Sequence, residues 1–382
     1  MAEVIFWGAL GIVAYVYVGY PCLIFMLARL RPRPVRKRPD AELPTVSFII
    51  TAYNEEPVIA AKLRNTLALD YPADRLQIIV VSDGSTDRTE EIVRTAFERV
   101  KLVAMGGRYG KTLAQNRAVA EARGEIVVFS DATTVYEPGS LRALVSSYAD
   151  PAVGCVTGSV VYGTESAKSV DRGRSAYWNY ESFLRRQESR FSSVLGAAGC
   201  VYSLRRRLYT PLEADMISDV AQAIRTVAQG YRAVVEDGAI VSEPTESRSI
   251  REELERRARV ITRGMRVKFR LRGFFLRHPW FLLQVLAHRV LRWAVPLFLI
   301  VAFLANLLLL DRTLYQALFA AHLALYGSAA LAYALERRNR RLPGLGIPLY
   351  FCVVNLAPIL ALRALARGEK QVTWETGRPP AG

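Results

Sequence analysis

The sequence predicts an α/β domain with a mostly parallel sheet, flanked by apolar helices long enough to cross a membrane. Short β-branched runs alternate with helical stretches within residues 44–272, which are expected to form one cytoplasmic domain. Apolar runs lie before and after that domain. Of the 382 residues, 51% are hydrophobic, and this composition excludes a disordered chain.

The N-terminal apolar run predicts a transmembrane helix over residues 1–30, because residues 4–28 hold no charge. A cleaved signal peptide is the alternative, but it requires a basic start and a shorter apolar core. The basic residues follow the run, in a proline-rich linker over 31–43 that is not expected to be helical. Because basic flanks lie on the cytoplasmic side, the N-terminus is expected outside.

The C-terminal apolar region, residues 293–366, predicts two or three further spans. Two strong candidates, 293–310 and 314–335, are joined by a short turn, and the stretch 344–366 is interrupted by prolines. If that last stretch crosses, the basic tail over 367–382 lies outside, against the positive-inside rule. A re-entrant or in-plane course therefore remains an alternative.

The segment 273–292 mixes histidine and arginine with apolar residues, which is typical of an amphipathic helix lying in the membrane interface. The net charge of +16 is explained largely by basic clusters beside apolar runs, and this placement argues against nucleic-acid binding. The four cysteines are too few for a disulfide framework.

Polar residues follow three of the predicted strands. Tyr53, Asn54 and Glu55 follow the first strand, Asp83 the second, and Asp131 ends the fourth. Ligands bind at the carboxyl ends of parallel strands, so these side chains are candidates for one site. Each aspartate alone is equally suited to a turn or a helix cap. The first strand is followed by neither a phosphate-binding P-loop nor a G-x-G-x-x-G dinucleotide motif.

The motifs TAYNE, VVSDGSTDRT, GKTLAQNRAV, VVFSDATT, GAAGCVYSLRR and ISDV…RRARV occur in this order between residues 43 and 268. Because it carries these six motifs in this order, the chain resembles the membrane-bound family 2 glycosyltransferases, which include cellulose-synthase-like and hyaluronan-synthase-like enzymes. The resemblance implies a GT-A fold (the nucleotide-diphospho-sugar transferase fold) and inversion at the sugar. It also implies a UDP-sugar donor and Mg²⁺ or Mn²⁺.

For the donor, the resemblance implies that Tyr53, Asn54, Glu55 and Asp83 hold the uridine. A carboxylate is suited to this role because it accepts hydrogen bonds from N–H and O–H groups. Lys111 matches a lysine beside the phosphates, where it would act as a point charge.

For the diphosphate, the resemblance implies metal binding by Asp131, although Thr133 replaces the second aspartate of the family's Asp-x-Asp motif. One carboxylate with phosphate oxygens and water can hold Mg²⁺. Arg256 and Arg259 match the basic positions that neutralise the leaving group, while Val260 replaces the tryptophan that follows them in the family. The missing tryptophan weakens the case for a long polymer.

For the acceptor, the resemblance implies that Asp219 is the catalytic base, with Asp215 as a weaker candidate for that role. The structural alternative for Asp219 is that it caps a helix. Gly199 and Tyr202 lie in the matching acceptor-side loop. The expected protein is an inner (plasma) membrane transferase that extends a polysaccharide. A single transfer to a lipid, or a nucleotide-sugar-binding relative without catalysis, is the alternative. An oligomer or partner subunits would be compatible with either product.

Overall fold

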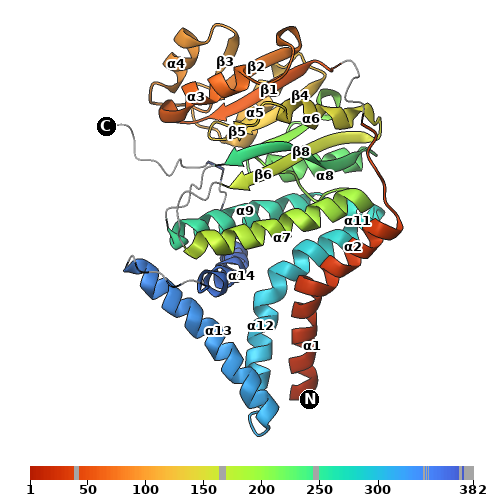
Figure 1. Ribbon diagram of the computed structural model, residues 1–382, viewed down its shortest axis with the longest axis vertical. Coiled ribbons are helices and arrows are strands. Elements are labelled where there is room, and N and C mark those ends of the chain that lie inside the picture. The colour runs from red at the N-terminus through yellow and green to blue at the C-terminus, as the bar shows by residue number, and fades with distance from the viewer. Residues whose placement is uncertain are drawn as a thin grey trace.

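The computed structural model describes most of the chain in one body (Figure 1). The described residues are 1–37, 43–162, 169–243, 249–338, 340, 342, 344–369 and 372–373. Part of the predicted basic linker (38–42) and most of the predicted tail (370–371 and 374–382) lie outside the described residues.

A mixed sheet with strand order β3-β2-β1-β4-β7-β6-β8-β5 forms the centre of the domain. The first half, β3-β2-β1-β4, is parallel throughout, and β6 is also parallel to β8. The antiparallel pairs are β4 with β7, β6 with β7 and β5 with β8. The prediction of a mostly parallel α/β sheet is therefore confirmed. The strands are β1 Val46–Ala52, β2 Leu76–Ser82, β3 Val100–Ala104, β4 Ile126–Asp131, β5 Val135–Tyr136, β6 Val153–Tyr162, β7 Val201–Arg205 and β8 Arg232–Glu243.

Helices cover both faces of this sheet. Successive side chains of a strand point to opposite faces, so each face packs against its own set of helices. Phe48 and Ile50 pack under α3, α4 and α6, whereas Ile49 and Phe129 pack under α5 and α8. Burial on both faces explains why the strands are continuously apolar. These helices are α3 Glu56–Leu67, α4 Thr89–Ala96, α5 Lys111–Ala120, α6 Ser140–Ser146 and α8 Ser218–Ala228.

Two long helices, α7 (Ser169–Phe191) and α9 (Ile250–Arg270), lie between the sheet and the apolar helices (Figure 1). By length and composition, four helical segments within the described residues are candidate membrane spans: 2–30, 279–307, 313–337 and 346–366. They comprise α1 Ala2–Ala14, η1 Tyr15–Gly19, α2 Tyr20–Leu30, α11 Pro279–Gln284, η5 Val285–Val290, α12 Leu291–Leu307, α13 Thr313–Arg337 and α14 Gly346–Ala366.

Two of these segments bend at a π-helical turn, the first at η1 and the second at η5 (Figure 1). Such turns insert a residue into the helical ladder and are a recognised cause of helix bends. The predicted interfacial segment 273–292 contains α10 (Arg272–Arg277) and α11. Its predicted end at residue 292 falls inside the continuous helical run 279–307, because the π-turn redirects the helix without ending it.

The helix α14 runs alongside α9, and both of its ends contact that helix. Near its start, the Tyr350 hydroxyl donates to Glu253 Oε1 at 3.0 Å. Just after its end, the Arg266 guanidinium donates to the Glu369 carbonyl at 2.6 Å. Figure 1 shows α14 crosswise to α12 and α13. Both ends of α14 therefore lie at the level of the domain.

The helix α7 is hydrogen-bonded to both bends. The Tyr180 hydroxyl donates to the Val16 carbonyl in η1 at 3.2 Å. Buried Glu188 accepts from the Tyr20 hydroxyl at 2.6 Å and lies 2.6 Å from His288 Nδ1 in η5. Carbonyls released by a π-turn need other donors, and α7 supplies one.

Candidate active site

The loops that follow β1 and β2 are joined by hydrogen bonds at the carboxyl edge of the sheet. Asn54 adopts a left-handed backbone conformation, with φ of 51°, and its Oδ1 accepts from the Thr86 amide at 2.8 Å. The Asn54 amide donates to Ser85 Oγ at 3.1 Å, and the Glu55 amide donates to Thr89 Oγ1 at 2.8 Å. Asparagine suits this turn because it tolerates left-handed geometry. The two predicted donor loops thus form one surface.

Asp83 is fully buried beneath this surface. Its carboxylate accepts from the backbone amides of Tyr109 at 2.8 Å and Gly110 at 2.9 Å. Burial raises the pKa of the Asp83 carboxyl, although these amides and Arg108 act in the opposite direction. The Arg108 guanidinium lies 3.9 Å from the centre of the Tyr53 ring. The loop after β3 therefore contacts Asp83 through Tyr109 and Gly110, and contacts the loop after β1 through Arg108 and Tyr53.

Lys111, Asp131 and Asp219 meet around Gly199. The Lys111 ammonium is paired with the Asp131 carboxylate and donates to the Gly199 carbonyl at 3.2 Å. A Cβ added at Gly199 would lie 3.2 Å from Asp219 Oδ2, which is a crowded contact, and 3.8 Å from Lys111 Nζ, which is an ordinary one. The structure therefore brings together the predicted base, metal ligand and phosphate-side lysine.

The electrostatics of this cluster suit proton and phosphate chemistry. Burial raises the pKa of the Asp219 carboxyl, although Lys111, Arg263 and Arg185 lower it. Burial alone would lower the pKa of the Lys111 ammonium, but Asp131 and Asp219 more than offset that effect and raise it. Lys111 is therefore held as a cation, and Asp219 is a stronger base than an exposed carboxylate.

The metal site implied by the resemblance is tested by the partners of Asp131 and Thr133. The Thr133 hydroxyl donates to Glu243 Oε1 at 2.6 Å, so Thr133 is engaged by a carboxylate from β8. Among the described residues, no group of three or more His, Cys, Asp or Glu could enclose a metal ion. Asp131 is already matched to a cation, the Lys111 ammonium. A single carboxylate of this kind fits Mg²⁺ or Mn²⁺ completed by phosphate oxygens and water.

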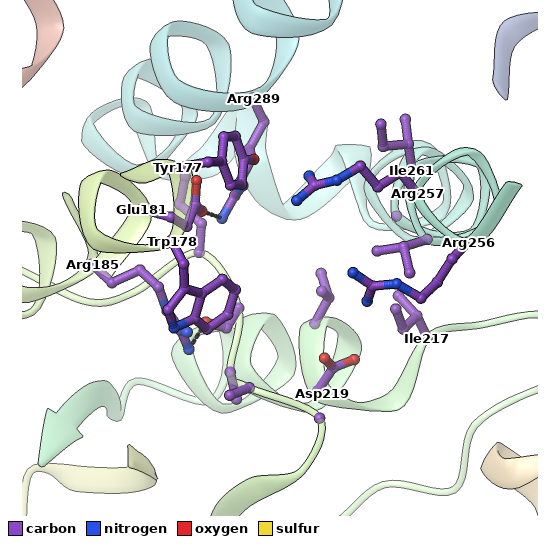
Figure 2. Close-up of a pocket in the computed structure, with 18 of the residues that line it drawn as sticks. Tyr177, Trp178, Glu181, Arg185, Ile217, Asp219, Arg256, Arg257, Ile261 and Arg289 are labelled. Atoms are coloured by element: carbon purple, nitrogen blue, oxygen red, sulfur yellow. Dashed lines mark hydrogen bonds and ion pairs between the residues drawn. The ribbon is translucent and has the colours of Figure 1, made fainter. Parts of the chain in front are cut away.

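A cavity of about 430 Å³ begins at Asp219 and Asp131 and extends between α7 and α9. Figure 2 shows Tyr177, Trp178, Glu181 and Arg185 of α7 on one wall, opposite α9. Its lining also includes Arg256, Arg257, Val260, Ile261 and Lys268 of α9, Arg289, Arg292 and Trp293 near the start of α12, and Val354 and Pro358 of α14.

The remaining predicted residues fall in different places. Arg256 lines the cavity and pairs with Glu253 at 2.9 Å, whereas Arg259 lies on α9 outside the described lining. Tyr202 is fully buried in the domain core, where its hydroxyl donates to Gln115 at 3.1 Å, so it does not face the cavity. Tyr202 lies on the strand β7, where alternate side chains point to the same face, and its side chain points into the core. The prediction that Tyr202 lies in an acceptor-side loop is therefore wrong.

Other site residues were not predicted. Arg263 donates to Thr112 Oγ1 at 3.1 Å and to the Met216 carbonyl at 2.7 Å, which joins α9 to the start of α5. Its spacing from Arg256 and Arg259 is helical, so periodicity could have identified this basic face. Glu243 and Lys268 carry no comparable signal, because only the tertiary fold brings them to the cavity.

The mixed sheet, with loops that converge at its carboxyl edge, defines the fold class as GT-A, the fold of nucleotide-diphospho-sugar transferases. One solved structure supports this fold along almost the whole chain. It is a mannosyltransferase from Pyrobaculum calidifontis in complex with GDP-Man and Mn²⁺, with a TM-score of 0.69 and 24% identity. The match covers 94% of this chain and 99% of that one.

Residues 47–211 match the family model for glycosyl transferase family 2, the family that the sequence motifs resemble. A β-monoglucosyldiacylglycerol synthase of Synechocystis is 32% identical over 38% of this chain and 31% of its own length. An N-acetylglucosaminyltransferase of Rhizobium meliloti is 28% identical over 61% of this chain and 60% of its own length. The chain therefore spans less than two thirds of the length of these relatives.

Proposed function

We propose that this protein is a membrane-integral, inverting glycosyltransferase that moves a sugar from a UDP-sugar to an acceptor at the cavity. The observation that carries this proposal is the cluster of Asp219, Lys111 and Asp131 around Gly199, at one end of the cavity. It sets a base, a cation and a metal-type carboxylate beside a space large enough for an acceptor group.

In the proposed reaction, an acceptor hydroxyl attacks the anomeric carbon opposite the diphosphate, and Asp219 takes the hydroxyl proton. The bond between the anomeric carbon and the diphosphate oxygen breaks, and its electron pair leaves on UDP. Lys111 and Arg256 lie on the side where that negative charge develops, and cations there stabilise it. Inversion follows from one displacement.

The residues that would hold a divalent cation are Asp131 and, through the Thr133 hydroxyl, Glu243. When bound, Mg²⁺ or Mn²⁺ would neutralise charge on the diphosphate. The Lys111 ammonium, which is paired with Asp131, is a second cation at this site and is supplied by the chain itself.

A membrane location with the domain on the cytoplasmic side is supported by the helix ends. Glu3 accepts from the Tyr315 hydroxyl at 2.6 Å, so the N-terminus and the α12–α13 turn lie at one end. The domain and both ends of α14 lie at the other. Three crossings and an in-plane α14 keep Arg367, which follows α14, on the domain's side, which agrees with the positive-inside rule.

Two products are compatible with this chemistry, a growing polysaccharide and a singly glycosylated lipid. The second is favoured by the lining of the cavity, because Trp293, Val354 and Pro358 of the candidate membrane helices form part of it. An acceptor with a hydrocarbon tail could enter from the side of these helices.

The test is Asp219→Asn in full-length protein reconstituted in nanodiscs, with UDP release from a panel of UDP-sugars as the readout. We expect a loss of about 100-fold or more, which is typical of removing a general base. Asp237→Asn is the matched control, because Asp237 is half exposed and pairs with Arg186 away from the cluster. Asp215→Asn tests the weaker alternative base, which instead pairs with Arg266 and Arg270. Full turnover in the Asp219 variant, or donor binding without metal-dependent turnover in the wild type, would overturn the proposal.

A further inference from the structure

Several cationic side chains line the cavity beyond Asp219, and Figure 2 shows Arg289 at the end opposite that residue. Arg289 and Arg292 share one carboxylate, Glu181, at 2.6 and 2.8 Å. Lys268 lines the same cavity, where the charges of both Asp219 and Arg289 act on its ammonium. It is 9% exposed, but it forms no hydrogen bond or ion pair with any described residue. Its ammonium instead lies 5.0 Å from the centre of the Trp293 ring.

Further donors in this region are unsatisfied. The Arg292 Nε and Nη2 atoms and the Arg185 Nε atom are buried without a hydrogen-bond acceptor among the described residues. Buried polar groups are normally paired, and a buried charge without a partner is costly. The pKa of the Lys268 ammonium is lowered to about 7 by burial, and nearby Arg289 acts in the same direction. An anion bound here would hold Lys268 protonated and would satisfy these donors.

The position of these cations relative to the rest of the cavity identifies the kind of anion. Figure 2 shows the cavity between the α7 and α9 walls, with Asp219, the proposed base, at one end and Arg289 at the other. Trp293 of α12 lies beside Lys268, and Val354 and Pro358 of α14 line the same cavity. A ligand that fills the whole cavity therefore contacts a base, cations and apolar helix side chains.

We propose that the acceptor is an anionic lipid whose hydroxyl-bearing headgroup is joined to its hydrocarbon through a phosphate. This proposal rests on the proposed glycosyltransferase function and specifies its acceptor. The hydroxyl reaches Asp219, the phosphate binds at Lys268 and Arg292, and the hydrocarbon leaves between α12 and α14. Arginine and lysine suit this role because they provide several donors to phosphate oxygens.

The test measures lipid binding to the full-length protein by native mass spectrometry. The probes are phosphatidylglycerol, whose headgroup hydroxyls follow a phosphate, neutral diacylglycerol, and soluble glycerol phosphate. We expect the wild type to bind phosphatidylglycerol at least about tenfold more tightly than either other probe. Lys268→Met should reduce this affinity about tenfold, whereas Lys268→Arg should retain it. Arg251→Gln is the matched control on the same helix, because Arg251 is exposed and pairs with Glu255.

The outcomes separate this proposal from the one on which it rests. If diacylglycerol or soluble glycerol phosphate binds the wild type as tightly as phosphatidylglycerol, the anionic-lipid assignment is wrong. Equal phosphatidylglycerol affinity in the wild type and a folded Lys268→Met variant would also overturn it. UDP-sugar turnover by the wild type is measured on the same preparation. Its absence would remove the glycosyltransferase function, whatever the lipid result.

Discussion

Replacing Gly199 by alanine should slow catalysis without unfolding the domain. The added Cβ would lie 3.2 Å from Asp219 Oδ2, so the carboxylate must move by a few tenths of an ångström. A displacement of about 1 Å at a reacting group costs about 100-fold in rate, so a few tenths should lower kcat about three- to tenfold. The backbone of Gly199 is not left-handed, and alanine is therefore tolerated there without backbone strain.

The assay is UDP release in nanodiscs at saturating donor, accompanied by a thermal unfolding curve. Gly196→Ala is the matched control, because its Cβ would be equally crowded, at 3.1 Å, but against the apolar Cγ2 of Val220. The donor KM should change little, since the displaced group acts on the acceptor. Unchanged kcat for Gly199→Ala, or an equal loss for Gly196→Ala, would refute the reasoning.

Three further predictions address the charges around the site. Arg263→Met removes a cation that lowers the pKa of Asp219. The acid limb of the plot of kcat/KM against pH should therefore move to higher pH. An unmoved limb would exclude Asp219 as the titrating base. Asp131→Asn should weaken Mn²⁺ binding in the presence of UDP, as measured by electron paramagnetic resonance, and unchanged binding would place the metal elsewhere. Burial lowers the pKa of Lys62 from 10.5 to about 7. Between these values the unfolded chain binds the extra proton, so the free energy of unfolding should rise with pH, and Lys62→Met should remove that contribution in denaturant titrations.

The first half of the domain was predictable because its signals are local. The strands β1, β2, β3 and β4 are apolar runs separated by helices, and the strand-end residues Asn54 and Asp83 follow directly from that alternation. The parallel arrangement then requires the carboxyl ends to meet at one edge.

The cavity was less predictable because its walls come from distant segments. Lys268 lies in a basic helix whose charges predict contact with anionic lipid headgroups. Only the tertiary fold shows that its side chain lines the cavity. Tyr202 shows the opposite case, since its motif suggests an acceptor loop but strand pairing directs its ring into the core. The course of α14 likewise depends on contacts with α9 that hydropathy alone does not encode.

The buried links from α7 to both helix bends have a mechanical consequence. Tyr180 and Glu188 hold η1 and η5 to the same helix that forms one wall of the cavity. The domain therefore cannot lift or tilt away from the apolar helices without breaking buried hydrogen bonds. Asp219 is therefore held at a fixed distance from the apolar helices. For the lipid acceptor proposed above, the distance between the headgroup hydroxyl and the hydrocarbon would then select the substrate, because a shorter headgroup would not reach the Asp219 carboxylate and a longer one would extend past it.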